Sequence, residues 1–450
     1  MAHTIVIVGA IAGGATTAAQ LRRMNDSYRI IMIDQNDAVA VSTCGLPYYV
    51  GNVIGDRDEL YMDAEQFSKT YDVDVWTNTE VIDIQSEDRT ITYQSSDGTE
   101  TLSYDKLVLS PGASAVVPEL PGLNEARTFT LHDLHDMDRI KQYIHKENPE
   151  HAVIVGAGFV GLETAENLVA AGINCTLIDR SASVLKLVDP DMGNLIQAHL
   201  EEKGIHVILE DGVASFSDKG QTIHLNSGHH IKTDMTILAV GIKPNTKLAQ
   251  QAGLTIGTTG AIQTNAFMQT NDRNIYAIGD AVETTDAKTG TPRHVALAAL
   301  AHRQAYIVAC HIAEQPVQYN GTIGTAILKI FDIDAGAAGL NSAALDTLNK
   351  PYVTATLDAR SHAGYYPGAE PLSIKIIFDA SDGTLYGGQV VGRDGVDKRL
   401  AVLATAIKGN MTVTDLTELE LGYAPPFSAP KDPLNIIGYK AQAMLSRVGR

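Results

Sequence analysis

The chain has 450 residues, a length that predicts two or three domains. Its residues are 44% hydrophobic and 19% charged, as is typical of globular proteins. Its formal net charge of -19 excludes nucleic acid and anionic membrane surfaces as expected partners, because both would repel it. Three scattered cysteines are too few for a disulfide framework or a zinc site, so no metal is expected. The opening residues show no signal-peptide pattern and the apolar runs are short, so we expect a cytoplasmic protein.

The first motif is a candidate dinucleotide-binding unit. Residues 4–8 form a β-branched run typical of a strand buried on both faces. A glycine turn follows, formed by Gly9, Gly13 and Gly14. A helix pattern and a second strand, 29–33, then lead to Asp34, whose carboxylate suits ribose hydroxyls, while the helix start suits a pyrophosphate. Ile11 replaces the second glycine of the G-x-G-x-x-G pattern, so this copy alone also fits a glycine turn in another α/β protein.

A second copy of the unit carries the full glycine spacing. Its turn is formed by Gly156, Gly158 and Gly161, and the strand that follows ends at Asp179. Two dinucleotide sites on one chain indicate two nucleotides, and hydride transfer between a nicotinamide and a flavin explains both. Asp179 favours NADH over NADPH because it would repel a 2′-phosphate, although Arg180 beside it keeps NADPH possible. Glu163 is a candidate for the nicotinamide pocket, or simply stabilises the start of its helix.

Three later segments complete the predicted flavin unit. A strand runs into the turn formed by Pro111 and Gly112, and another ends on Gly279 and Asp280, where a carboxylate can accept a ribityl hydroxyl. Alone, that pair would equally fit an ordinary turn. Residues 283–294 are polar and predict a surface loop, followed by a helix over 295–309. This helix contains His302, which we interpret as a flavin contact or a core histidine.

The carboxy-terminal third changes to antiparallel-looking strands. The expected strands are 325–331, 351–357, 372–378 and 387–392, and a helix is expected over 398–408. This pattern predicts a separate α+β domain.

Cys44 lies between small residues, glycine and proline, about thirty residues beyond the first glycine turn. A thiol in such a segment can lie against a flavin and exchange electrons with it. The alternative is a buried structural thiol, which is the reading we favour for Cys175 and Cys310. Attack on a disulfide needs a thiolate, so we expect the site to lower the pKa of Cys44, through a cofactor edge or a helix start.

The order of these motifs resembles the flavoprotein disulfide reductases that have two dinucleotide-binding domains, over essentially the whole chain. Within them the chain looks most like the single-cysteine branch, which contains coenzyme A (CoA)-disulfide reductases, NADH oxidases and NADH peroxidases, because no second cysteine lies near Cys44. The resemblance implies an α/β fold with two Rossmann-like domains, as in glutathione reductase, plus a carboxy-terminal α+β dimerisation domain, in a homodimer. The implied domains are FAD-binding segments at 1–115 and 246–320, an NAD(P)H-binding domain at 116–245 and an interface domain at 321–450.

The resemblance also implies an activity. NADH or NADPH would reduce FAD, and the electrons would pass through Cys44 to CoA disulfide, or to a CoA persulfide or polysulfide, by way of a Cys44–CoA mixed disulfide. Oxidase and peroxidase relatives carry a histidine in the first glycine turn, and the matching residue here is Ala12. Two tyrosines of the partner subunit reach the active site in CoA-disulfide reductases. By position these are Tyr365 and Tyr423, for which ordinary interface packing is the alternative.

The CoA contacts implied by the resemblance are Thr16, Gln20, Arg23 and Lys431. Arg22 is a further candidate for the CoA phosphates, and solvated helix residues are the alternative for both arginines. The family pattern is Ser-Phe-x-x-Cys, commonly with asparagine just before the thiol, and it is broken here because Ala40, Val41 and Thr43 occupy the serine, phenylalanine and asparagine positions. Two other functions therefore stay open: a water-forming NADH oxidase or an NADH peroxidase, in which Cys44 cycles through a sulfenic acid, and a flavin-binding redox sensor.

Overall fold

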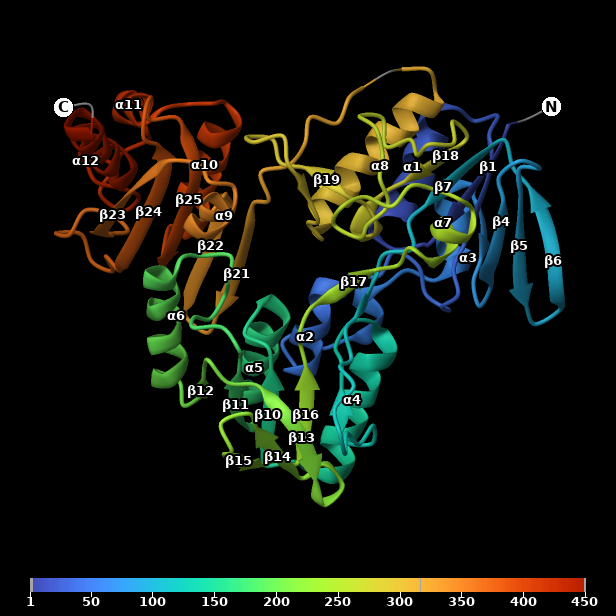
Figure 1. Ribbon diagram of the computed structural model, residues 1–450, viewed down its shortest axis with the longest axis horizontal. Helices are drawn as coiled ribbons and strands as arrows, with labels where there is room; N and C mark the ends of the chain where they lie inside the picture. Colours follow the sequence, from blue (N-terminus) through green and yellow to red (C-terminus); the bar gives the residue numbers. More distant parts are fainter. Residues whose placement is uncertain (1–2, 316, 449–450) are drawn as a thin grey trace.

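The computed structural model describes residues 3–315 and 317–448, which form three units around a central region (Figure 1). The first unit is built on a parallel sheet in the order β18-β7-β1-β2-β3. Its strands are β1 (Thr4–Val8), β2 (Arg29–Ile33), β3 (Asp74–Trp76), β7 (Lys106–Leu109) and β18 (Ile275–Ala277). The apolar side chains of β1 are almost wholly buried, as its β-branched sequence predicts for a central strand.

Helices and a meander surround this sheet. Helices α1 (Ala12–Met24) and α8 (Ala298–Ile312) pack closely against each other through small residues such as Ala18 and Ala305. The antiparallel strands β4 (Glu80–Gln85), β5 (Thr90–Ser95) and β6 (Gly98–Ser103) form the outer edge of the unit (Figure 1). Three shorter helices complete it: α2 (Leu46–Val50), α3 (Ala64–Tyr71) and α7 (Lys247–Gln251).

The second unit repeats the arrangement, with a parallel sheet in the order β12-β11-β10-β16-β9. Its strands are β9 (Thr128–Phe129), β10 (His151–Val155), β11 (Asn174–Ile178), β12 (His206–Ile208) and β16 (Met235–Leu238). The helices are α4 (Leu134–Glu147), α5 (Phe159–Ala170) and α6 (Pro190–Glu202). A small antiparallel sheet is formed by β13 (Val213–Ser217), β14 (Thr222–Leu225) and β15 (His230–Lys232).

The chain enters and leaves the second unit through one two-stranded ribbon. Strand β8 (Ala113–Ala115) carries the chain in, and β17 (Ile242–Pro244) carries it back, antiparallel and hydrogen-bonded. The side-chain amide of Asn245 extends this pairing by donating to the Pro111 carbonyl over 2.8 Å. The two crossings therefore lie side by side.

The third unit contains an antiparallel sheet in the order β21-β22-β25-β24-β23. Its strands are β21 (Ala326–Ile330), β22 (Ile333–Gly339), β23 (Tyr352–Arg360), β24 (Pro371–Asp379) and β25 (Leu385–Gly392). Its helices are α9 (Ser342–Thr347), α10 (Val396–Lys408), α11 (Val413–Glu418) and α12 (Pro433–Val448). Every residue of β25 is buried, because this strand lies inside the sheet and has α10 packed on it.

A buried ion pair joins the third unit to the second. Lys375 of β24 lies 2.8 Å from carboxylate oxygens of both Asp189 and Asp191, at the start of α6. The Ser342 hydroxyl donates to Asp189 over 2.7 Å. Asp189 is almost fully buried, so its charge depends on these partners for compensation.

Several sequence-based expectations need correction. The 283–294 segment is not purely a surface loop, because β19 (Thr284–Thr285) and β20 (Pro292–Arg293) form a hairpin around Asp286. Asp286 is buried and its carboxylate lies 2.7 Å from the Arg293 guanidinium. Helix α8 begins and ends three residues later than predicted. Strand β22 was not predicted, because its alanines and glycines give no apolar alternation. In the part of the chain that the structure describes, no helix has the length and apolar character needed to span a membrane.

Candidate active site

A cavity of about 1010 Å³ lies at the carboxyl ends of the first unit's strands and reaches the β8–β17 ribbon. Its volume is at the upper end of the range for small-molecule sites, as a dinucleotide requires. The structure brings eight of the predicted residues together in its wall: Gly9, Gly13, Asp34, Cys44, Pro111, Gly112, Gly279 and Asp280. Ala12 lies in the same wall.

The first glycine turn fits an extended phosphate-bearing cofactor. Gly9 has a φ of +99°, and a Cβ there would lie 2.1 Å from the Ser110 carbonyl oxygen. A Cβ on Gly14 would lie 1.8 Å from the Gly9 carbonyl oxygen, so glycine is needed where α1 approaches β1. No side chain caps the start of α1 and no acidic residue occupies its first turn, so its N–H groups suit a pyrophosphate.

Asp34 follows β2 and faces both the turn and the cavity. Its carboxylate accepts a 2.7 Å hydrogen bond from the Ala10 N–H and a 2.9 Å bond from the Asn36 N–H. These bonds fix the carboxylate at the cavity wall. The glycine turn, the uncapped helix and this carboxylate fit the FAD that the sequence predicts.

The second glycine turn repeats the geometry. Gly156 has a φ of +113°, and a Cβ on Gly161 would lie 1.9 Å from the Gly156 carbonyl oxygen. A Cβ on Gly158 would meet nothing within 4 Å, which leaves open space at the start of α5. Burial opposes the ionisation of Asp179, but hydrogen bonds from the Ala157 N–H and from Ser181 outweigh it and lower its pKa. The turn therefore fits a second nucleotide, with an ionised acid after β11.

Cys44 lies in a 3-10 turn, Thr43–Gly45, directly before α2. Its side chain is accessible, whereas Cys175 and Cys310 are buried. Partial desolvation by the surrounding walls raises the pKa of the Cys44 thiol, and the negative charges of Glu163 and Asp280 raise it further. The expectation that the site lowers this pKa is therefore wrong for the chain's own groups, because burial and the two carboxylates outweigh the hydrogen bonds from Thr43 and the backbone that lower it.

Tyr48 is a site residue that the sequence analysis missed. Its hydroxyl donates to the Glu163 carboxylate over 3.3 Å, which links α2 of the first unit to α5 of the second. Burial raises the pKa of Glu163 to about 7, although the hydrogen bond from Tyr48 opposes this rise. Burial and the same carboxylate raise the pKa of Tyr48 to about 12. Its position four residues after Cys44, one helical turn away, was the available signal.

The predicted CoA contacts on α1 lie outside the cavity. Thr16, Gln20 and Arg23 are spaced by four and three residues and so share one face of the helix, where Arg23 is exposed. The Thr16 hydroxyl lies 2.7 Å from Nδ1 of His302, whose side chain is exposed on α8. The core alternative for His302 is therefore wrong, and its predicted flavin contact stays a prediction. Arg22 is instead bound to backbone carbonyls, including that of Asp72, so its guanidinium is engaged within the fold.

Tyr365 and Tyr423 meet on the third unit. Their hydroxyl oxygens lie 3.0 Å apart, and the side chains are 75% and 46% exposed. The hydrogen bond from Tyr365 raises the pKa of Tyr423. Lys431 is exposed on the same unit, over the ring of Tyr439. The helices α11 and α12 of this unit lie at the left of Figure 1, whereas α2, the helix that follows Cys44, lies near the centre.

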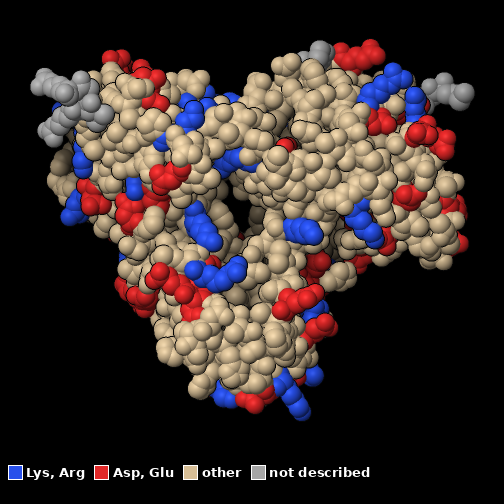
Figure 2. Space-filling model, viewed as in Figure 1, with Lys and Arg blue, Asp and Glu red and all other residues tan. Residues whose placement is uncertain are grey.

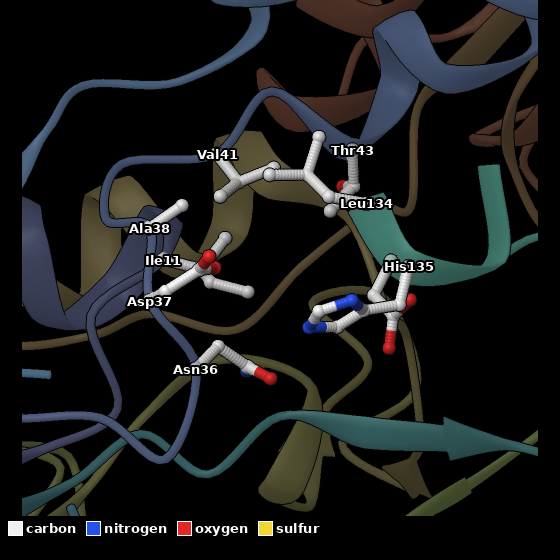
Figure 3. A pocket seen from close by; sticks show the side chains of 9 residues that line it. Ile11, Asn36, Asp37, Ala38, Val41, Thr43, Leu134 and His135 are labelled. Atoms are coloured by element: carbon white, nitrogen blue, oxygen red, sulfur yellow. The ribbon is translucent and has the colours of Figure 1, made fainter. Parts of the chain in front are cut away.

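A small side pocket of about 20 Å³ adjoins the Cys44 segment (Figure 3). Its apolar side comes from Ile11, Ala38, Val41 and Leu134, and Thr43 closes it beside the cysteine. The His135 ring lies across the opening from Asn36 in Figure 3. Val41 and Thr43 are two of the residues that depart from the family pattern, so the departure lies next to the thiol.

The face of the molecule shown in Figure 2 has a central hollow where the three units meet, and Lys and Arg side chains lie around its rim. Basic side chains therefore gather at this hollow although the formal net charge of the chain is -19.

The chain belongs to the pyridine nucleotide-disulphide oxidoreductase family. The family's profile matches residues 3–305, and the profile of its dimerisation domain matches residues 325–433. The predicted fold and enzyme class are thereby confirmed: the protein is an FAD-dependent NAD(P)H:disulfide oxidoreductase.

Particular relatives narrow this class. The coenzyme A disulfide reductase of Staphylococcus aureus (strain bovine RF122 / ET3-1) is 39% identical over 447 residues, covering 97% of this chain and 99% of the relative. The crystal structure of reduced Bacillus anthracis CoADR-RHD has a TM-score of 0.98 at 43% identity, covering 99% of this chain and 81% of that one. An NAD-dependent persulfide reductase from A. fulgidus has a TM-score of 0.96 at 34% identity, covering 99% of this chain and 84% of that one.

Proposed function

We propose that the protein reduces CoA disulfide, or a CoA persulfide or polysulfide, with electrons from NADH or NADPH, in the cytoplasm. The observation that carries the proposal is the placement of Cys44, an accessible thiol in the wall of the cavity that fits FAD. Cys175 and Cys310 are buried elsewhere, so the described chain offers no partner for an internal redox disulfide. The relatedness to CoA disulfide reductases over nearly the whole chain supports the same substrate.

The glycine turns and acids hold the two nucleotides. Gly9, Gly13, Gly14 and Asp34 hold the FAD pyrophosphate and ribose, while Pro111, Gly112, Gly279 and Asp280 line its other end; His302 is a further candidate contact. Gly156, Gly158, Gly161 and Asp179 hold the pyridine nucleotide, with Glu163 beside the nicotinamide. The bound FAD supplies two-electron transfer between the nicotinamide and the sulfur of Cys44.

Cys44 carries the substrate covalently. Its thiolate attacks one sulfur of CoA disulfide, forming a Cys44–CoA mixed disulfide and expelling one CoA thiolate. Two electrons from the nucleotide then break the mixed disulfide, which restores the Cys44 thiolate and releases the second CoA thiolate. Each departing thiolate takes one proton, so NADH, one proton and CoA disulfide give NAD⁺ and two CoA thiols.

A second copy of the chain completes the site in this proposal. Tyr365 and Tyr423 of one protomer reach Cys44 of the other, where a phenol protonates the departing thiolate. Their exposure supports this arrangement, as does the match to a dimerisation domain. The proposed domain boundaries are 1–115 with 246–320, 116–245 and 321–450.

The CoA moiety lies along α1 in this arrangement. Thr16, Gln20 and Arg23 face it from one side of the helix, and Lys431 of the partner offers a positive charge to its phosphates. The residues before Cys44 give this protein fewer polar groups for the pantetheine than the family pattern does, so its substrate can differ in detail.

The test is NADH oxidation by the purified flavoprotein under strict anaerobiosis, with and without CoA disulfide. Turnover that requires the disulfide, is lost in Cys44→Ser and is retained in the control variant Cys175→Ala supports the proposal. Turnover restored by air while the disulfide has no effect would assign an NADH oxidase or peroxidase instead. Ala12 argues against that outcome, because its methyl side chain places no acid–base group in the cavity wall where the oxidase and peroxidase relatives carry a histidine.

A further inference from the structure

The two tyrosine-bearing loops are joined below the surface by one buried arginine. Arg399 of α10 is 1% exposed, and its Nη2 donates to Asp432 Oδ2 over 2.9 Å and to the Ser361 carbonyl over 2.8 Å. Ser361 opens the loop that carries Tyr365, and Asp432 ends the loop that carries Tyr423. The guanidinium therefore spans both loops at once.

Further bonds make this connection continuous. The Ser428 hydroxyl donates to Asp432 Oδ2 over 2.6 Å, and the Ala363 N–H donates to the Ser428 carbonyl over 3.1 Å. Asp432 also accepts a 3.0 Å bond from the Leu434 N–H and so caps the start of α12. Burial opposes the ionisation of Asp432, but these hydrogen bonds and the charge of Arg399 lower its pKa.

Above this network the tyrosines have little support of their own. Tyr365 and Tyr423 are exposed, and the hydrogen bond between their hydroxyls is the polar contact that the structure gives each side chain. Their relative position therefore depends on how the two loops are held from beneath. A planar guanidinium can donate to a carboxylate and a carbonyl in fixed directions, which an ammonium on a flexible stem does not reproduce.

We propose that Arg399, through its pair with Asp432, is a positioning residue that holds Tyr365 and Tyr423 in register for proton donation across the dimer. The inference rests on the proposed function, since it concerns the same tyrosines. It adds a structural requirement: efficient proton donation by Tyr365 or Tyr423 needs the buried Arg399–Asp432 pair.

The test is a mutant cycle in the dimeric holoenzyme, with anaerobic CoA-disulfide turnover as the readout. Arg399→Lys retains the charge but loses the fork, and Asp432→Asn serves as a second isosteric probe of the same bridge. Each is made in the wild-type chain and in a Tyr365→Phe/Tyr423→Phe background. Lys375→Arg is the matched control, because it alters a buried ion pair of the same unit that contacts α6 instead of the loops.

We expect Arg399→Lys to lower kcat about 10-fold, which is less than the roughly 10²–10⁴-fold typical of a general acid itself, because the tyrosines are displaced and not removed; KM should change less than about 2-fold. In the double-phenylalanine background the same substitution should lower kcat no further, because the tyrosines through which it acts are gone. NADH oxidation with a small artificial acceptor, which needs no proton from the tyrosines, should be unchanged. Lys375→Arg should not show a loss of kcat that is present in the wild-type chain and absent in the double-phenylalanine background.

Two results overturn the inference while leaving the proposed function intact. One is an equal loss of kcat in both backgrounds, which would mark a general structural defect. The other is full activity of Arg399→Lys and Asp432→Asn when the phenylalanine variants lose activity. If the phenylalanine variants themselves keep full activity, the tyrosine roles in the proposed function fail, and the positioning role of Arg399 fails with them.

Discussion

Glutamine in place of Glu163 removes the charge that contributes most to raising the pKa of Cys44. Burial raises the pKa of Glu163 from 4.5 to about 7, a difference of about 2.5 pH units. At 1.36 kcal/mol per unit, the site disfavours the Glu163 carboxylate by about 3 kcal/mol. The carboxyl is therefore mostly neutral near about pH 6 and mostly ionised near about pH 8, so its effect on the thiol depends on pH.

Alkylation of Cys44 by iodoacetamide measures this effect, because the thiolate is the reactive form and the other two cysteines are buried. In reduced, flavin-free protein we expect Glu163→Gln to raise the rate about 3- to 10-fold at about pH 8, because loss of the carboxylate charge lowers the pKa of the thiol. At about pH 6 the two proteins should react alike. An equal rate ratio at both pH values, or a slower variant at about pH 8, would refute the reasoning.

The same shift has a consequence for stability. Between about pH 4.5 and 7 the unfolded chain ionises Glu163 and the folded chain does not, so folding stability falls as the pH rises through this window. Glu163→Gln should remove this loss, and the gain over wild type should grow to at most about 3 kcal/mol above pH 7. Urea unfolding at the two ends of the window checks the sign.

Three further predictions follow from the second unit and its contact with the third. Gly161→Val should raise KM for NADH at least about 10-fold with flavin content unchanged, because the added Cβ lies 1.9 Å from the Gly156 carbonyl oxygen. Asp179→Ala should raise KM for NADH about 10-fold and shift the NADPH-to-NADH ratio of kcat/KM upward, because the acid that bonds the Ala157 N–H and opposes a 2′-phosphate is gone. Lys375→Met should destabilise the protein by about 3–5 kcal/mol in urea unfolding, because it leaves Asp189 buried without its cation; a loss below about 1 kcal/mol would contradict this.

Both nucleotide-binding units could be read from the sequence because two independent signals coincide in each. The β-branched runs specify buried parallel strands, and the glycines mark places where a Cβ would collide with the backbone, as at Gly14 and Gly161. These constraints are local, so they survive in a single sequence. The gathering of Cys44, Asp34 and Asp280 around one cavity follows from the strand order that the motifs imply.

The parts that were missed depend on contacts between distant segments. The pairing of Tyr48 with Glu163 joins residues 115 positions apart, so the spacing from Cys44 could mark Tyr48 as close to the thiol but not as the partner of Glu163. Arg22 was predicted as a candidate phosphate ligand, but its guanidinium bonds to the backbone near Asp72. These bonds form only when α3 packs beside α1, and the sequence does not show that contact. The raised pKa of Cys44 likewise reflects burial and carboxylates from two other elements, whereas the sequence suggested only a cofactor edge or the adjacent helix start.

The β8–β17 ribbon gives the second unit the connectivity of an inserted module. Ala113 pairs with Pro244 and Ala115 with Ile242, so the ends of a segment more than a hundred residues long lie next to each other. A unit whose two ends meet can be exchanged or altered with little strain on its host, as is known for tolerated domain insertions. Evolution can therefore change the choice between NADH and NADPH within this segment while the flavin cavity and Cys44 keep their geometry.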